Sequence, residues 1–301
     1  MQTELRSFRP SYKISVVIAI LLAITIIGLA YSYFIEPNKL VVRHEQLAVN
    51  GWNKAFDGFR IVMIADIHGG SNGGSAENIR SVVAAANAED ADVVVLLGDY
   101  VSEDQSGRLK MPMSDIADAM SGLKARYGVF AVMGNHDWRY GDEGVERELS
   151  RVGYSVLKND IVTIEKNGQK LRLLGLKDHM YLGNWKDFSD AAKQVVAPSE
   201  GTGDLIVLEH SPDILPTVTN ELAISNDLKL VLCAHTHGGQ VWLPILGRPV
   251  IPSSYGQKYA YGHIFDRGVD MWVTSGTGTS VLPFRFMVPP EIVVLTVRSG
   301  A

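Results

Sequence analysis

Five of the chain's eight histidines stand in short polar motifs that each follow an apolar run. In chain order the motifs are Asp66-Ile67-His68, Gly98-Asp99, Gly134-Asn135-His136-Asp137, Glu209-His210 and His235-Thr236-His237. Carboxylate, amide and imidazole groups are the donors that borderline divalent ions accept in mixed sets. Two ions lying about 3.5 to 4 Å apart also need a bridging carboxylate and terminal ligands on each side. The pattern therefore predicts a dinuclear metal centre that hydrolyses phosphoesters.

The spacing within the motifs indicates how the ligands are presented. Asp66 and His68 are two residues apart, so on an extended segment both side chains point the same way and can hold one ion. His235 and His237 share this spacing. Asp99 is the natural candidate for the bridging carboxylate.

The third motif suggests a catalytic pair. Asn135 is the better metal ligand, which leaves His136 beside the acidic Asp137. A carboxylate near an imidazole can hold it protonated and oriented, as a general acid for the leaving alkoxide requires. We therefore predict catalytic roles for His136 and Asp137. The alternative is that Asp137 only caps the turn.

The elements that must position these motifs form an alternating α/β pattern. Apolar runs at 59–64, 92–97 and 129–133 are interpreted as buried strands, and 76–88 and 114–126 have helical periodicity. This β-α-β-α-β order predicts a parallel sheet. Asp66, Asp99 and Asn135 each lie just past the carboxyl end of one strand, the edge where open α/β sheets bind ligands.

The second half of the chain predicts further strands. A hairpin is expected within 154–174, with its turn at Lys166-Asn167-Gly168. The strands 204–208 and 228–233 end in the fourth and fifth motifs, and two more are expected at 271–273 and 292–295. No segment has the composition of an interdomain linker, so we expect one compact domain over residues 35–301.

The amino-terminal segment predicts a membrane anchor. Residues 14–30 are all apolar, Ser, Thr or Gly, and aromatic residues follow, so we expect a transmembrane helix or signal anchor at 14–34. Basic residues are more frequent in the preceding tail, 1–13, than in the segment after the helix. We therefore expect a single-pass protein of the cell membrane, with the tail in the cytoplasm and the domain on the extracytoplasmic side. The alternative is a cleaved signal peptide, because Gly28-Leu29-Ala30 offers small residues for cleavage.

Composition excludes some partners. A formal net charge of −5 disfavours nucleic acid, since domains that bind it usually carry a basic face. Cys233 is the single cysteine, so it forms no internal disulfide, and its apolar surroundings predict a buried thiol.

The ordered motifs resemble the five blocks of the calcineurin-like metallophosphoesterase superfamily, with Ala234-His235-Thr236-His237-Gly238-Gly239-Gln240 as the last block. The chain is similar to a bacterial membrane-anchored branch, judging by Phe56-Asp57-Gly58-Phe59-Arg60, the His-Thr-His-Gly-Gly-Gln run and Ser275-Gly276-Thr277-Gly278-Thr279-Ser280. The resemblance implies a four-layer α/β/β/α sandwich of two mixed sheets. Ala234 departs from the family, which commonly has Gly there, and the added methyl group is expected to tighten the loop.

The resemblance also implies a division of roles. One ion would be held by Asp66, His68, Asp99 and His237, and the other by Asp99, Asn135, His210 and His235. His136 would contact the phosphate. The two ions would be Mn, Fe, Zn or Mg, and the chemistry an in-line attack on phosphorus by metal-bound hydroxide.

The substrate expected from this reading is a phosphodiester or pyrophosphate, either lipid-linked or a nucleotide-diphospho compound. Protein phosphatases of this superfamily carry arginines after the Gly-Asp block, whereas Tyr100-Val101-Ser102-Glu103-Asp104 follows here, which disfavours a phosphomonoesterase or protein phosphatase. The rival from another class is a membrane-tethered metal-binding or scaffold protein without turnover. His179 is expected to be a solvated loop residue.

Overall fold

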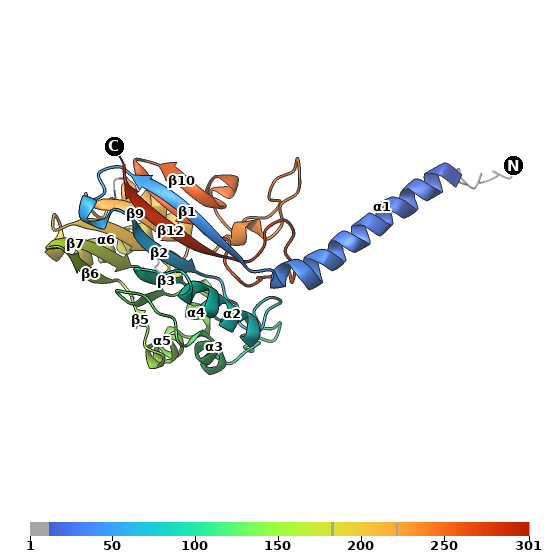
Figure 1. The fold of residues 1–301 in the computed structure, drawn as a ribbon, viewed down its shortest axis with the longest axis horizontal. Helices are drawn as coiled ribbons and strands as arrows, with labels where there is room; N and C mark the ends of the chain where they lie inside the picture. The colour runs from blue at the N-terminus through green and yellow to red at the C-terminus, as the bar shows by residue number, and fades with distance from the viewer. Residues whose placement is uncertain (1–11, 182–183, 221, 301) are drawn as a thin grey trace.

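The computed structural model describes residues 12–181, 184–220 and 222–300 (Figure 1). Two six-stranded sheets form the body of the molecule, and one long helix projects from it. Of the expected cytoplasmic tail, residues 1–11 lie outside the described part.

The first sheet has the strand order β1-β12-β2-β3-β4-β5. Its strands are β1 (Val41–Val49), β2 (Phe59–Ile64), β3 (Val93–Leu97), β4 (Val129–Val132), β5 (Ser155–Val156) and β12 (Glu291–Ser299). The strands β2, β3, β4 and β5 are parallel, as the β-α-β-α-β pattern predicts, and β12 runs antiparallel to β2. Their carboxyl ends therefore meet at one edge.

The second sheet has the order β10-β11-β9-β8-β7-β6. Its strands are β6 (Asp160–Lys166), β7 (Gln169–Gly175), β8 (Asp204–Leu208), β9 (Leu228–Cys233), β10 (Gly262–Asp266) and β11 (Val269–Val273). The strands β7, β8, β9 and β11 are parallel, while β6 and β10 are antiparallel at the two edges. The expected hairpin is β6–β7, and both turn residues, Asn167 and Gly168, have positive φ.

Alternate residues of the strands face different cores, which produces four layers. Ile61 and Met63 pack between the two sheets, whereas Val62 and Ile64 face outward. The outer face of the first sheet is covered by α2 (Ala76–Asn87), α3 (Met113–Met120) and α5 (Asp142–Arg151). The outer face of the second is covered by α6 (Trp185–Val196) and α7 (Leu215–Thr219). The expected α/β/β/α sandwich of two mixed sheets is confirmed.

Some local expectations differ from the structure. The helix expected at 114–126 ends at Met120, because Ser121 is extended and Gly122 adopts positive φ. The helix α6 and the edge strand β1 were not expected. Apolar and polar residues do not alternate cleanly along β1, and most of its residues are only partly buried or exposed. The local sequence therefore gave no clear strand pattern.

The projecting helix is α1 (Tyr12–Ala30), which is followed directly by a π-helical turn (Tyr31–Ile35) and a 3-10 turn (Glu36–Asn38). By length and composition this apolar segment can cross a membrane. Backbone and side-chain hydrogen bonds fix its end to the body: Arg285 N–H donates to Ser32 O, Asn72 Nδ2 to Tyr33 O, and Val288 N–H to the Glu36 carboxylate. The boundaries 14–34 and 35–301 remain predictions.

Candidate metal centre

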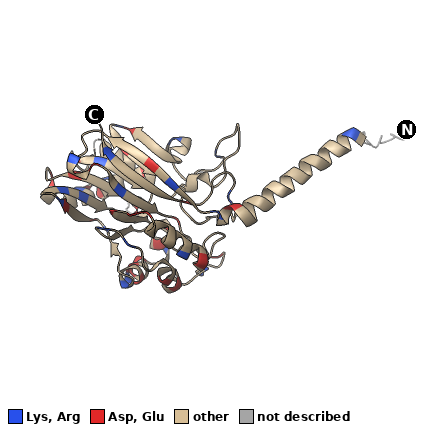
Figure 2. Cartoon of the chain, viewed as in Figure 1, with Lys and Arg blue, Asp and Glu red and all other residues tan. Residues whose placement is uncertain are grey.

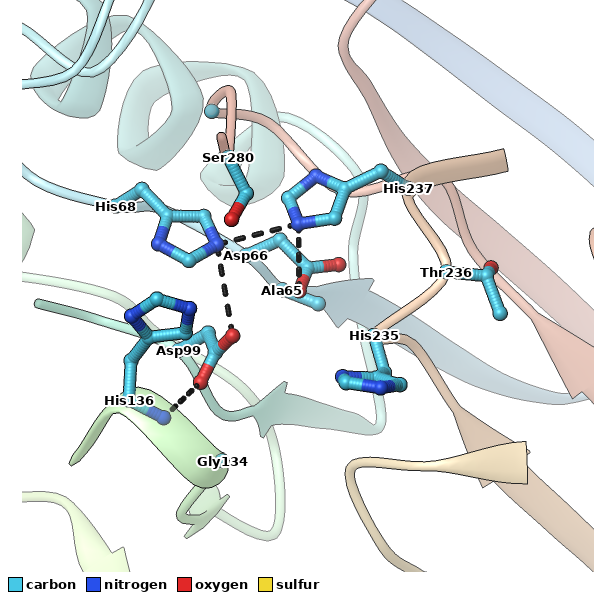
Figure 3. Close-up of polar contacts among 12 residues, drawn as sticks. Ala65, Asp66, His68, Asp99, Gly134, His136, His235, Thr236, His237 and Ser280 are labelled. Atoms are coloured by element: carbon cyan, nitrogen blue, oxygen red, sulfur yellow. Dashed lines mark hydrogen bonds and ion pairs between the residues drawn. The ribbon is translucent and has the colours of Figure 1, made fainter. Parts of the chain in front are cut away.

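All five polar motifs come together where the strand ends of the two sheets adjoin. Figure 3 labels residues of four of them. Asp66, Asp99 and Asn135 follow β2, β3 and β4 of the first sheet. His210 follows β8, and His235 and His237 follow β9, of the second. Parallel neighbouring strands end at a common edge, so side chains far apart in the chain become neighbours.

The backbone presents these side chains in a way that differs from the expectation. Asp66, His68, His235 and His237 do not lie on extended segments, since all four have φ between 43° and 68°. Asp99 has φ 56°. Left-handed backbone is unfavourable for residues other than Gly and clusters at functional sites. The ligand pairs therefore face the site through left-handed turns, not through strand alternation.

Three residues form the first group of the centre. His68 Nε2 lies 3.2 Å from His237 Nε2, and His237 Nε2 lies 3.6 Å from Asp66 Oδ1. The His68 and His237 rings are stacked with their centroids 5.0 Å apart. One atom from each side chain lies within 4.8 Å of the others, a separation that suits three ligands of one ion.

The second group lies on the other side of Asp99. His235 Nδ1 lies 3.1 Å from His210 Nε2, and Asn135 Oδ1 is a buried atom with no hydrogen-bond partner among the described residues. Asp99 Oδ2 lies 3.3 Å from His210 Nε2 and 3.5 Å from His68 Nε2. A single carboxylate oxygen therefore stands between the two groups, as a bridging ligand must.

His68 and His210 both present Nε2 to the centre. His68 Nδ1 donates to Val101 O at 3.2 Å, and His210 Nδ1 donates to Leu97 O at 2.7 Å, so in the neutral rings Nε2 is an acceptor. Burial lowers the pKa of His68 and of His235 to about 3, which favours their neutral, metal-binding form. Histidine ligands usually donate the other N–H to a carbonyl in this way.

Asp66 provides the clearest test of fit. Its side chain is fully buried, and neither carboxylate oxygen has a hydrogen-bond partner among the described residues. Burial raises the pKa of Asp66 to about 8. A buried carboxylate is costly unless a cation or hydrogen bonds compensate it. Together with the acceptor nitrogens, this donor set fits divalent cations.

His136 adjoins the first group but is held by a different residue from the one expected. Its ring lies edge-on to that of His68 with centroids 4.8 Å apart, and its backbone N–H donates to Asp99 Oδ1 at 2.9 Å. Arg139 Nη2 donates to His136 Nδ1 at 3.0 Å, and Glu103 pairs with the same guanidinium. Burial lowers the pKa of His136.

The carboxylate of Asp137 faces the backbone and makes no hydrogen bond to the His136 ring among the described contacts. It accepts four backbone N–H bonds of 2.8 to 3.2 Å, from Asp99, Tyr100, Val101 and Gly134. The expectation that Asp137 holds His136 protonated is therefore not met. The side chain instead ties the loop after β3 to the start of α4 (Asn135–Tyr140).

Sequence reasoning assigned no role at the site to four residues that lie beside it, namely Arg139, Glu103, Ser280 and His179. Arg139 and Glu103 lacked a motif, although Arg139 stands three residues after His136, one helical turn away. Ser280 points between His68 and His237 (Figure 3). His179 is largely buried and not solvated as expected: its ring stacks on Trp185 with centroids 4.6 Å apart, and it contacts the buried carboxylate of Glu209.

The departure at Ala234 is accommodated in the core. Its side chain is fully buried among the residues between the sheets, and its backbone N–H donates to His210 O at 2.8 Å. The methyl group thus packs where it adds apolar contact, and the bond joins the two loops that carry His210 and His235.

A pocket of about 450 Å³ opens directly onto the centre. The polar part of its wall comes from Asp99, Asn135, His136, His235 and His237. The rest of the wall comes mainly from two loops that follow the last motif and precede β12. The centre is therefore accessible to a ligand larger than phosphate.

The family model and three relatives that this chain resembles are all named as phosphoesterases or metallophosphoesterases. Residues 59–239 match the family model of the calcineurin-like phosphoesterases. The chain is 29% identical to a metallophosphoesterase of Bacillus subtilis, YkuE, over 90% of each chain. It is 29% identical to the phosphodiesterase YaeI of Escherichia coli over 89% of this chain and 92% of the relative. It is 27% identical to a zebrafish (Danio rerio) transmembrane protein with a metallophosphoesterase domain, over 98% of this chain and 64% of the relative.

Proposed function

Because the chain belongs to the calcineurin-like phosphoesterase family, we propose that it is a membrane-anchored, two-metal phosphodiesterase. The observation that supports this best is the position of Asp99 Oδ2, which lies within 3.5 Å of ligand nitrogens from both groups. The proposal assigns Asp66, His68, Asp99 and His237 to one ion and Asp99, Asn135, His210 and His235 to the other.

Two bound cations would supply Lewis-acid activation of water and neutralisation of charge on the phosphoryl oxygens. The reaction adds water across one P–O ester bond, so the leaving alkoxide must gain a proton. His136 is the residue placed to assist. Arginine can only donate, so the bond from Arg139 makes His136 Nδ1 an acceptor and puts the hydrogen of the neutral ring on Nε2. In the proposed mechanism that N–H donates a hydrogen bond to a phosphoryl or leaving-group oxygen, while the proton that the alkoxide gains comes from the attacking water.

Two acidic residues act as positioning residues in this mechanism. Glu103 holds the Arg139 guanidinium, with Nη2 to Oε2 at 2.6 Å, and so fixes the His136 ring through Arg139. Asp137 holds the backbone of Asp99 and Gly134 in place, and thereby the Asp99 carboxylate that would bridge the two ions. Asp137 is thus proposed to support catalysis without touching the substrate.

A phosphodiester or pyrophosphate is the proposed substrate class. The pocket beside the centre leaves room for a second ester substituent, which a phosphomonoester lacks. The similar protein from Escherichia coli is named a phosphodiesterase. No arginine follows Asp99 within Tyr100–Asp104, where the protein phosphatases of this superfamily carry theirs.

The proposed location is a membrane, with α1 as a single span. The segment is long and apolar enough, and a similar protein is named as a transmembrane protein. The basic tail before α1 favours a cytoplasmic amino terminus and an extracytoplasmic domain. Protease added to intact spheroplasts is expected to digest the domain, and resistance would place it inside the cell.

Two hypotheses, an enzyme and a metal-binding scaffold without turnover, are distinguished by measuring metal content together with manganese-dependent hydrolysis of bis-p-nitrophenyl phosphate. Asp99→Ala is expected to lose about 10³-fold or more in kcat, because two-metal stabilisation supplies several kcal/mol. His136→Ala is expected to lose about 10²-fold in kcat while it keeps its metals. The exposed Asp115→Ala and His263→Ala are the matched controls and should behave as the wild type.

Full activity in Asp99→Ala would overturn the site assignment. Metal uptake by the wild type without hydrolysis of any mono-, di- or pyrophosphoester would instead favour the scaffold.

A further inference from the structure

Two loops beside the candidate metal centre present apolar side chains to solvent. We name them the 241–250 loop, which follows the last motif, and the 279–287 loop, which precedes β12. Ile245 and Val281 at their tips are fully exposed, and Leu246, Val250 and Met287 are more than half exposed. A contiguous exposed apolar patch usually marks an interaction surface.

The backbone at both tips is strained. Ile245 has φ 75° and Val281 has φ 59°. β-branched residues are genuine outliers in this left-handed region, where Gly or Asn would be comfortable. Apolar, β-branched side chains therefore occupy the two tips in spite of a conformational cost. Because both side chains are exposed to solvent, packing within the protein does not offset this cost.

The two loops are fastened to each other. Gln240 Nε2 donates to Ser280 O at 2.9 Å, while Gln240 Oε1 accepts from Ser280 N–H at 2.6 Å. Trp242 N–H donates to Phe286 O at 2.9 Å. The buried Arg285 guanidinium donates to the carbonyls of Ser275, Gly276, Gly278 and Val288, which holds the 279–287 loop in shape. The patch is thus a built surface.

The same surface is fastened to the end of the apolar helix. Asn72 Nδ2 donates both to Tyr33 O at 2.7 Å and to Pro283 O at 2.6 Å, and Arg285 N–H donates to Ser32 O at 3.0 Å. Figure 1 shows α1 leaving the body on the side where both loops, coloured orange and dark red, project. A bilayer crossed by α1 would therefore meet these loops.

Charge is absent from the part of the surface that would meet the bilayer. Residues 241–247 and 279–284 contain no Asp, Glu, Lys or Arg. Figure 2 shows the long helix in tan with one basic segment at its amino-terminal end, and the tip of the neighbouring loop also in tan. Arg248 stands at the inner end of its loop, where its guanidinium donates to Gly238 O.

The pocket connects this surface to the metal centre. Its lining combines the apolar side chains of Val241, Val250, Val281, Leu282 and Phe284 with candidate ligands of the metal centre. A pocket of about 450 Å³ that is lined by apolar side chains and also reaches the polar candidate ligands suits an amphiphile.

Building on the proposed function, we propose that both loop tips enter the bilayer beside α1 and that the pocket receives the hydrocarbon tail of a membrane-resident phosphodiester. The phosphate would reach the metal centre while the tail lies along the apolar wall. The substrate class is thus a lipid phosphoester, drawn from the membrane that holds the enzyme.

The test compares p-nitrophenyl hexadecyl phosphate with p-nitrophenyl methyl phosphate, using the full chain in lipid nanodiscs with manganese. Both esters release p-nitrophenolate, so they differ only in the tail. Partition into the disc favours the long ester in every variant equally, and the informative quantity is therefore the change in the long-to-short ratio of kcat/KM. In Val250→Ser/Leu282→Ser this ratio is expected to fall about tenfold, because each methylene removed from apolar contact costs several-fold.

Phe265→Ser is the matched control, since Phe265 is an exposed apolar residue of β10 outside the pocket. Its ratio should equal that of the wild type. An unchanged ratio in the double variant would overturn the tail pocket while leaving the phosphodiesterase intact. Failure to hydrolyse either ester would overturn the proposed function, and this inference with it.

Loop insertion is measured separately from activity. Cys233 is buried, so an environment-sensitive fluorophore on Ile245→Cys labels one site. Spin-labelled lipids in the nanodisc are expected to quench it, and they should not quench the same label on Phe265→Cys. A label at residue 245 that is quenched only by aqueous iodide would overturn the insertion. Shielding from both quenchers would do so too, and would indicate a protein partner on this surface.

Discussion

The candidate metal centre and the two apolar loops lie side by side but are built in opposite ways. The centre consists of polar side chains at the ends of buried strands, and most of its residues are buried. The loops consist of apolar side chains on irregular backbone, and their tips are fully exposed. Only the pocket between them belongs to both.

The contrast indicates that the metal centre carries out the chemistry and that the loops determine which substrate is bound. Strand ends are fixed by two sheets and three cores, so they can hold donors at distances near 3 Å even on left-handed backbone. Loops can change in sequence without loss of the fold, and they suit recognition. Changes at the centre should therefore affect every ester alike, whereas changes at the loops should affect only long-chain esters.

Removal of the metals is the change with the largest expected effect. A strong chelator should lower kcat for the methyl and hexadecyl esters by about 10³-fold or more. It should also lower the free energy of unfolding, by about 3 to 4 kcal/mol for each ion that was held at 100 to 1,000 times its Kd. The reason is that the buried Asp66 carboxylate, whose oxygens have no hydrogen-bond partner among the described residues, loses the cations that compensate it. Activity and thermal unfolding check both effects, and manganese should restore them.

If the chelated protein kept its activity or its melting temperature, the centre would not depend on cations. The proposed difference between the metal centre and the apolar loops would then be wrong.

Asp137→Asn tests whether a positioning residue can disturb the centre without touching a ligand side chain. The amide N–H₂ would face backbone N–H groups that now donate to a carboxylate oxygen. We expect unfolding to become easier by about 1 to 3 kcal/mol and metal affinity to fall about 10- to 100-fold. Denaturant titration and metal titration measure these. The exposed Asp115→Asn is the control, and equal behaviour of the two variants would contradict a role for Asp137.

Arg139→Ala addresses the orientation of His136. Without the guanidinium, His136 Nδ1 loses its donor and the ring can turn. We expect kcat to fall about tenfold for both esters, with unchanged metal content and little change in KM. Arg139→Lys should recover part of this loss, whereas the exposed Arg147→Ala should lose none. A fall confined to the hexadecyl ester would place Arg139 in tail recognition instead.

Asn72→Ala is expected to have the smallest effect and the most selective one. It removes the two hydrogen bonds that Asn72 Nδ2 donates to Tyr33 O and Pro283 O, which lowers the free energy of unfolding by about 1 kcal/mol. The ratio of hexadecyl to methyl ester hydrolysis in nanodiscs should fall about two- to threefold, as the loops lose their fixed relation to α1. Asn220→Ala, which removes a bond to Arg267 far from this junction, is the control. Equal losses on both esters would argue that Asn72 acts on the centre.

The core of the fold could be predicted from local pattern. The strands at 59–64, 204–208 and 228–233 have the expected bounds because continuous apolar runs of strand length have few alternatives once both faces are buried. The helix end at Met120 and the strand β1 could not be predicted in the same way. The first depends on the backbone of Ser121 and Gly122, and the second on its pairing with β12, 242 or more residues away in sequence.

The site shows the same division. The residue types and their places after strands indicated which side chains gather, since parallel strands share an edge. The partner of His136 could not be foreseen, because adjacency in sequence favoured Asp137 while the helical turn brings Arg139 to the ring and directs Asp137 to the backbone.

The sequence by itself therefore determined the alternating sheets, the membrane-length helix and the set of donors, because burial and metal chemistry act through residue type and spacing. Only the tertiary structure decided the left-handed presentation of the ligands, the oxygen of Asp99 that stands between both groups, and the apolar loops joined to α1. These depend on contacts between segments more than 100 residues apart, such as His210 with Leu97 and Asn72 with Pro283, and no local pattern encodes them.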